Sequence, residues 1–320
     1  MELPNREVRH GLVAAYAEVV GSLGLLSTER ALVLPNGEFF PDRFTADEAS
    51  VQRMLDRLLE HAGISDMALV VRFYGEPAEG CGTGACGSCG PTPAAPESEA
   101  MQRLIDAGEH WQVNVLPAEV GSPVALGSAL CQAIALAVIR EADTPPRNLP
   151  LELAIELTAI ALGYGVLLLE GSHMYRKSCG GPSIARATAL GPTEVALVLA
   201  LSAAISEQSL RKVGKYLSAT QSEAFAEAAA WADSNPALVQ SLRAAPERVA
   251  RGEFQLREPS SWLGRWLGTK LRRAPSAESA TTIEELEAAL GAGAKPRPAL
   301  KAHDPKLDEI RRLVDEALSE

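Results

Sequence analysis

Three cysteines lie close together in a glycine-rich segment, at Cys81, Cys86 and Cys89. Thiolate sulfur binds zinc and iron–sulfur clusters, and glycines let a loop wrap closely enough to direct backbone N–H groups at a metal centre. Both kinds of centre need a fourth ligand. Cys179 follows a predicted helix and is the better candidate, whereas Cys131 lies in an apolar segment and is expected to be a small buried hydrophobe.

The C-x4-C-x2-C spacing resembles the first three ligands of plant-type [2Fe-2S] ferredoxins. The resemblance is confined to residues 81–90, and no further cysteine follows at the short distance that the ferredoxins use. A zinc site formed by these three cysteines and Cys179 is equally compatible with tetrahedral thiolate chemistry. A loop with reduced thiols and no metal is the third alternative, so the cofactor is zinc, a [2Fe-2S] cluster or none.

A second hypothesis concerns His173, which lies six residues before Cys179 in a polar segment. A histidine can activate a cysteine as a nucleophile, which would make the chain a thiol-dependent enzyme. A hydrogen-bonded histidine at a helix end is the simpler interpretation. The sequence contains no Walker loop, dinucleotide fingerprint or Gly-x-Ser-x-Gly.

The hydrophobic pattern around these residues predicts a mainly α protein with a small N-terminal sheet, an α+β fold. Apolar periodicity predicts helices over 8–26, 97–107, 124–142, 149–170 and 192–205, and strands over 67–73 and 111–116. Gly163 and Gly165 in the fourth of these helices indicate close approach by a neighbouring helix. Asn36-Gly37 and the flanking prolines predict an ordered turn, with Phe39 and Phe40 directed at the core.

The same pattern divides the chain into three parts. Residues 1–120 form an N-terminal α/β part that contains the Cys-rich loop, 75–96. Residues 121–256 form a helical core, and residues 257–320 form a helical tail with linkers.

Two segments extend the interpretation to a family. Glu38-Phe39-Phe40-Pro41-Asp42 and Leu162-Gly163-Tyr164-Gly165-Val166, together with the order of the helices, resemble an uncharacterised bacterial family. Many of its members have a helix with HExxH and then a helix with an acidic residue ahead of Gly-x-Gly, a layout similar to zincin-type metallopeptidases. The resemblance implies a zincin-like helical core.

The position that matches HExxH is occupied by Gln132, Ala133 and Leu136. Zinc hydrolysis needs two imidazoles one helical turn apart and a carboxylate that takes a proton from bound water. Gln132 is a poor zinc ligand, Ala133 cannot act as a base, and Leu136 offers no donor atom. No metal is therefore expected at this position, and the resemblance implies a pseudoenzyme without peptidase activity.

The acidic helix of the family is retained as Glu152 and Glu156, which are four residues apart and share a helix face. Buried carboxylates need a partner or a raised pKa. The two form either a remnant or repurposed polar pocket, or a structural pair of carboxylates satisfied by nearby arginines or helix ends. The candidate partners of these carboxylates are Arg140, Arg147, His173 and Arg176.

Overall charge limits the partners. A net charge of −11 argues against nucleic acid and anionic membrane surfaces. Glu152 and Glu156 interrupt the longest apolar stretch, which favours a core helix over a membrane span. The N-terminal sequence predicts no signal peptide, so the chain is expected to be cytoplasmic. The favoured function is a non-catalytic binding or scaffold protein for an unknown protein or small molecule; the alternatives are the metal-binding protein and the thiol-dependent enzyme.

Overall fold

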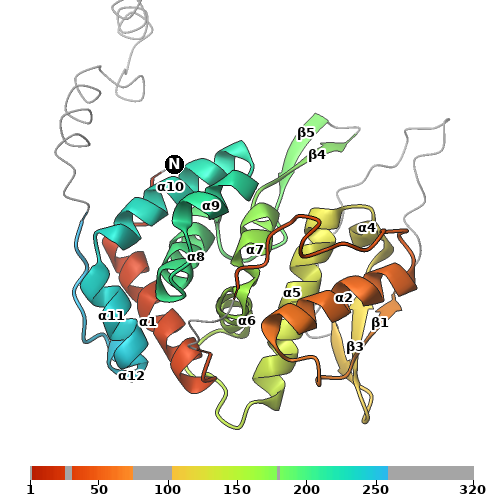
Figure 1. The fold of residues 1–320 in the computed structure, drawn as a ribbon, viewed down its shortest axis with the longest axis horizontal. Coiled ribbons are helices and arrows are strands. Elements are labelled where there is room, and N and C mark those ends of the chain that lie inside the picture. The colour runs from red at the N-terminus through yellow and green to blue at the C-terminus, as the bar shows by residue number, and fades with distance from the viewer. Residues whose placement is uncertain (1, 26–30, 75–102, 179–180, 259–320) are drawn as a thin grey trace, which may run out of the picture. The chain divides into compact units, whose positions relative to one another are not determined.

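Three apolar helical segments that follow one another in the chain form the centre of the protein, as the sequence predicted (Figure 1). They are α5 (Pro123–Glu141), the segment from α6 to α7 (Leu151–Gly171) and α8 (Pro192–Ile205). α5 packs against α6 and α7, and α8 packs against α7. The computed structural model describes residues 2–25, 31–74, 103–178 and 181–258.

The middle segment is not the continuous helix that its hydrophobicity predicts. α6 (Leu151–Ala159) passes into a π-helical turn, η1 (Ile160–Tyr164), and then into α7 (Gly165–Gly171). Gly163 has a φ of +98°, which side-chain-bearing residues rarely adopt, and its carbonyl accepts a hydrogen bond from the backbone N–H of Val33 at 2.9 Å. A Cβ at Gly165 would lie 2.7 Å from Leu199 Cδ1, so α8 does approach this segment closely.

A sheet of three strands lies beside this core. β1 (Leu69–Phe73) pairs in parallel with β3 (Trp111–Val115), which pairs in antiparallel with β2 (Leu104–Asp106). α2 (Glu48–Ala62) and α5 pack against the strands. β2 falls where a helix over 97–107 was expected, and that expectation is wrong for residues 104–106. Leu104 is buried opposite Val113, so pairing with β3 outweighs the local helical pattern.

The remaining helices surround the centre. α1 packs against α6, α8 and α12, while α10 packs along α8. These helices and the shorter turns are α1 (Arg6–Ser22), α4 (Pro117–Val120), α9 (Leu210–Val213), η2 (Gly214–Tyr216), α10 (Ala219–Asp233), α11 (Pro236–Ala244) and α12 (Pro246–Ala250).

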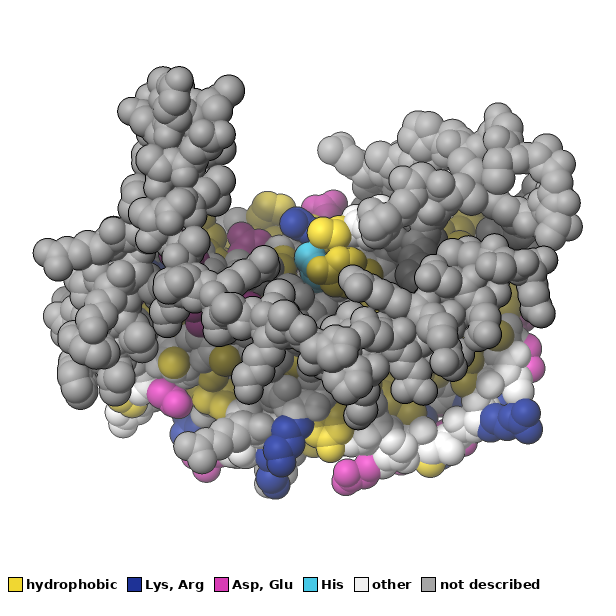
Figure 2. All heavy atoms as spheres, turned by 90° about the horizontal axis from the view of Figure 1, so that it is seen from above, with side chains coloured by type: hydrophobic (Ala, Val, Ile, Leu, Met, Phe, Trp, Pro, Cys, Tyr) yellow, Lys and Arg dark blue, Asp and Glu magenta, His cyan; other side chains and the backbone are white. Residues whose placement is uncertain are grey.

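A two-stranded ribbon that the sequence did not predict projects from the helices between α7 and α8 (Figure 1). β4 (Met174–Ser178) runs antiparallel to β5 (Gly181–Ala185), with Tyr175 opposite Ile184. Both of these side chains are exposed. Figure 2 looks onto the face from which the ribbon projects, and hydrophobic side chains are visible at its surface.

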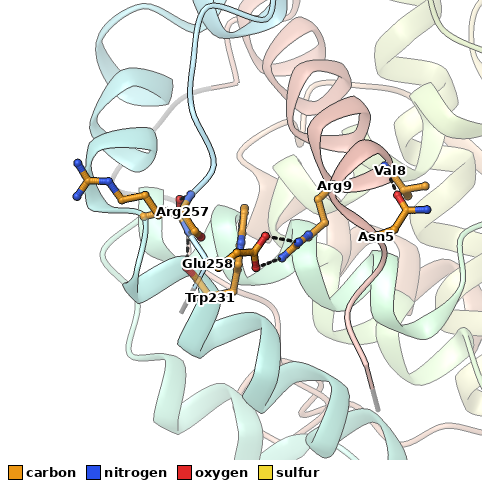
Figure 3. Close-up of polar contacts among 7 residues, drawn as sticks. Asn5, Val8, Arg9, Trp231, Arg257 and Glu258 are labelled. Carbon is orange, nitrogen blue, oxygen red and sulfur yellow. Dashed lines mark hydrogen bonds and ion pairs between the residues drawn. The ribbon is translucent and has the colours of Figure 1, made fainter. Parts of the chain in front are cut away.

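The chain after α12 is fixed to the body by two polar side chains (Figure 3). The Asn235 side chain accepts a hydrogen bond from the Arg257 N–H at 2.7 Å and donates to the Arg257 carbonyl at 2.9 Å. The buried guanidinium of Arg9 donates to both carboxylate oxygens of Glu258 and lies over the ring of Trp231, 5.9 Å from its centroid. Arg257 and Glu258 are therefore held against α1 and the junction between α10 and α11.

The described residues belong to one compact unit, Met1–Pro259. Within the described part of the chain, two helical stretches are long and apolar enough to cross a membrane, Pro123–Glu141 and Leu151–Gly171. Most of their residues are buried inside the protein. Helices in a protein core share this length and composition, so the absence of a membrane partner stays a prediction. The three-part division of the chain also stays a prediction.

Candidate functional site

The proposed cysteine ligands Cys81, Cys86, Cys89 and Cys179 lie outside the described residues. Cys131 is fully buried in α5, and burial raises the pKa of its thiol, as fits a small hydrophobic side chain. Over the described ranges, no group of three or more His, Cys, Asp or Glu side chains could hold a metal ion. His173 packs edge-on against Tyr175, and its pairing with Cys179 stays a prediction.

Gln132, which the expected resemblance places at the start of HExxH, and Glu156 are joined by one hydrogen bond, and both bind the segment 187–190. Gln132 on α5 directs its side-chain N–H at the backbone carbonyl of Ala187, 2.8 Å away, and at Glu156 Oε1, 3.4 Å away. Glu156 on α6 accepts from the N–H of Ala189 at 2.5 Å through Oε1 and from that of Leu190 at 2.9 Å through Oε2. The two side chains thus hold residues 187–190, which lead from the ribbon into α8.

Among the described residues, Glu156 carries the only buried carboxyl group, with a relative exposure of 2%. Desolvation by burial raises its pKa to about 7, while the hydrogen bonds from Leu190 and Ala189 act in the opposite direction and the charges of Glu194 and Glu152 add to the rise. Glu156 can therefore exchange a proton near neutral pH. Because main-chain N–H groups bind both of its oxygens, it is poorly placed to bind a metal ion.

The two carboxylates of α6 lie in different environments. Glu152 shares the helix face but is exposed, and it lines a small cavity of about 140 Å³ together with Arg103 and Gln132. The partners of Glu156 are backbone N–H groups and the Gln132 amide, not Arg140 or the other cations proposed. Arg140 lies over the ring of Trp111 instead. The sequence could not show this, because the segment 187–190 returns to α6 only after an unforeseen ribbon.

Ala133 and Leu136, the other two residues that the expected resemblance aligns with HExxH, are fully or almost fully buried and line the same small cavity. Neither contributes a polar side-chain atom. Gln132, Ala133, Leu136, Glu152 and Glu156 therefore line one small cavity, and Gln132 and Glu156 are joined there by a hydrogen bond.

A larger cavity, of about 500 Å³, lies between the turn at Pro35–Phe44, α2, α5, α7 and η2. Its lining is mainly apolar and includes Phe40, Met54, Leu126 and Leu167. The sequence analysis identified the turn but not the cavity. The turn is ordered by its own polar groups, since Asn36 Oδ1 accepts hydrogen bonds from the N–H groups of Glu38 and Phe39 at 3.0 and 3.2 Å.

The rim of this apolar cavity contains both hydrophobic and charged side chains. Phe44, Val124 and Tyr216 line it and remain 38 to 39% exposed. Arg57 on α2 donates to Asp42 of the turn at 3.0 Å, which fixes the turn to the helix. A cavity of this size and apolar lining is typical of a small-molecule site. A hydrophobic turn before a helix is the signal that could have pointed to it.

Comparison with known proteins adds no assignment. No family model, no curated protein and no solved structure matches this chain, so the resemblance of its sequence to the zincin-like family stays a prediction.

Proposed function

We propose that this chain is a non-catalytic binding protein, with a zincin-like core whose former catalytic position has become structural. The main support is the hydrogen bonding of Glu156, whose two oxygens accept the N–H groups of Ala189 and Leu190. A hydrolytic zinc site needs three protein ligands and an open position for water. The Gln132–Glu156 cluster offers one carboxylate, already bound to the main chain.

The binding site of this proposal is the 500 Å³ apolar cavity, and its ligand is a small, mainly apolar molecule. Apolar lining supplies affinity through the area it removes from water, and a preformed cavity lowers the entropy lost on binding. The partly exposed side chains of Phe44, Val124 and Tyr216 at the cavity rim give an apolar ligand a path of entry.

Calorimetric titration of the full chain with decan-1-ol tests the binding site. Gly127 of α5 lines the cavity, and a Cβ there would lie 3.6 Å from the flexible end of Met54, so Gly127→Leu fits the helix and fills the space. We expect saturable binding that Gly127→Leu abolishes. Gly11→Leu is the matched control, because Gly11 is exposed on α1 with open space around it. Unchanged decan-1-ol binding by Gly127→Leu would exclude the cavity.

Peptidase and metal assays test the non-catalytic part of the proposal. Protein supplied with zinc is expected to leave casein intact. Its zinc content is expected to equal that of Gln132→Ala and of Glu156→Ala. Hydrolysis that a chelator stops would refute this part and leave the cavity proposal standing.

The cysteine spacing supports a second proposal, a metal-binding protein with zinc or a [2Fe-2S] cluster at Cys81, Cys86 and Cys89. Metal analysis of aerobically and anaerobically purified protein separates the alternatives. A visible absorption band indicates the cluster, and colourless stoichiometric zinc indicates a structural site. Metal-free protein in both preparations would refute the second proposal.

A further inference from the structure

The charged groups that line the 500 Å³ cavity are not equivalent. Arg57 donates to Asp42 at 3.0 Å and to Glu60 at 2.9 Å, so its charge is balanced by two carboxylates. Of the carboxylates in the lining, Asp42 is bound to Arg57, and Glu170 accepts the N–H of Ser218 at 2.7 Å. Arg43 is exposed, and its guanidinium makes no ion pair or hydrogen bond within the described part of the chain.

We propose that the ligand is an amphipathic carboxylate, whose apolar chain or ring fills the cavity and whose anionic group binds Arg43. This inference rests on the proposed function of the cavity. An arginine guanidinium presents paired N–H donors in a plane that matches a carboxylate, and such charge-assisted hydrogen bonds are stronger than neutral ones. Because Arg43 lines an apolar cavity, a molecule with one anionic end and an apolar body complements both features.

The net charge of −11 does not oppose this ligand strongly. At physiological ionic strength, charges separated by more than about 8 Å are largely screened in solvent, so the groups beside the rim dominate. Asp42 in the lining is paired with Arg57, and Glu170 accepts the main-chain N–H of Ser218. Arg43 is the cation of the lining that no carboxylate of the described residues pairs with. The cavity also limits the size of the occupant, since about 500 Å³ suits a small molecule and not a folded segment.

The test compares decanoate with decan-1-ol, which have the same chain and differ in the charged end. Titrations use the full chain, Arg43→Gln and, as the matched control, Arg53→Gln. Arg53 is an exposed arginine of α2 outside the cavity lining, so its removal changes the net charge equally. We expect Arg43→Gln to weaken decanoate binding about tenfold, as the loss of one charge-assisted contact implies, and to leave decan-1-ol binding unchanged. Arg53→Gln should bind both ligands as the unaltered chain does.

Three outcomes separate this inference from the function on which it rests. Equal weakening of decanoate by Arg43→Gln and Arg53→Gln would overturn the role of Arg43. If Gly127→Leu abolishes decan-1-ol binding but Arg43→Gln leaves decanoate binding intact, the ligand needs no anionic group at Arg43. That result would refute this inference and preserve the apolar binding site. Decanoate binding that survives Gly127→Leu would overturn the site itself.

Discussion

Arg9 and Glu258 are 249 residues apart in the sequence, yet the Arg9 guanidinium donates to both oxygens of the Glu258 carboxylate, at 2.6 and 3.0 Å. The two partners differ in environment: the Arg9 side chain is 9% exposed and that of Glu258 is 58% exposed. The pair joins α1, near the start of the chain, to the segment that follows α12.

Removing the charge of Glu258 should destabilise the protein modestly. Glu258→Gln keeps one acceptor oxygen but leaves the buried guanidinium with a weaker partner. We expect the free energy of unfolding to fall by about 1 kcal/mol, because the carboxylate is largely solvated. Urea denaturation measures the change. Glu253→Gln is the control, since it breaks only surface pairs with Arg248 and Arg251, and its effect should be clearly smaller. Equal changes in the free energy of unfolding for Glu258→Gln and Glu253→Gln would mean that the Arg9–Glu258 pair adds no more stability than a surface pair.

Stability should also depend on pH through Glu156. Its pKa is raised from 4.5 to about 7, so the folded protein holds this proton more tightly than the unfolded chain does. The resulting stabilisation is complete below pH 4.5 and is lost as pH rises to about 7, by about 3 kcal/mol in total. Urea denaturation from pH 4.5 to 8 should show this fall superimposed on other titrations. In Glu156→Gln the neutral amide cannot titrate, so the difference between the two proteins isolates the effect. A difference that is constant with pH would contradict it.

Gly163→Ala should destabilise the kink between α6 and α7. The φ of +98° at this position places a Cβ in an unfavourable conformation that costs about 1–2 kcal/mol. A lower midpoint of thermal unfolding would report the loss. Gly11→Ala is the control, at an exposed position of α1, where alanine should stabilise the protein by about 0.5–1 kcal/mol. A stabilising Gly163→Ala would show that the kink is absent in solution.

Gly171→Ala should be destabilising for a steric reason. A Cβ at Gly171 would overlap Ser128 Oγ and lie 3.0 Å from Ser128 Cβ, and Ser128 is held by donation to the carbonyls of Val124 and Leu167. Overpacking of this kind costs about 1–3 kcal/mol. Ser128→Gly removes both obstructing atoms, so Gly171→Ala should cost less in that background. Additive effects in the double-mutant cycle would exclude the clash.

The sequence by itself determined the apolar helices, the small sheet and the positions of Gln132 and Glu156. Helical periodicity and strand alternation are local consequences of which side chains must leave water, so they can be read from spacing. The contact between Gln132 and Glu156 did not follow, because the partners expected for Glu156 were Arg140, Arg147, His173 and Arg176.

Only the tertiary structure decided what these residues contact. Whether Leu104 joins a helix or a strand depends on β3, and whether Glu156 meets an arginine or the N–H groups of Ala189 and Leu190 depends on how the chain returns from the ribbon. The cavity beside Arg43 likewise forms from the turn, α2, α5, α7 and η2 together. Contacts between segments far apart in the chain arise from packing geometry, and a single sequence has no local signal for it.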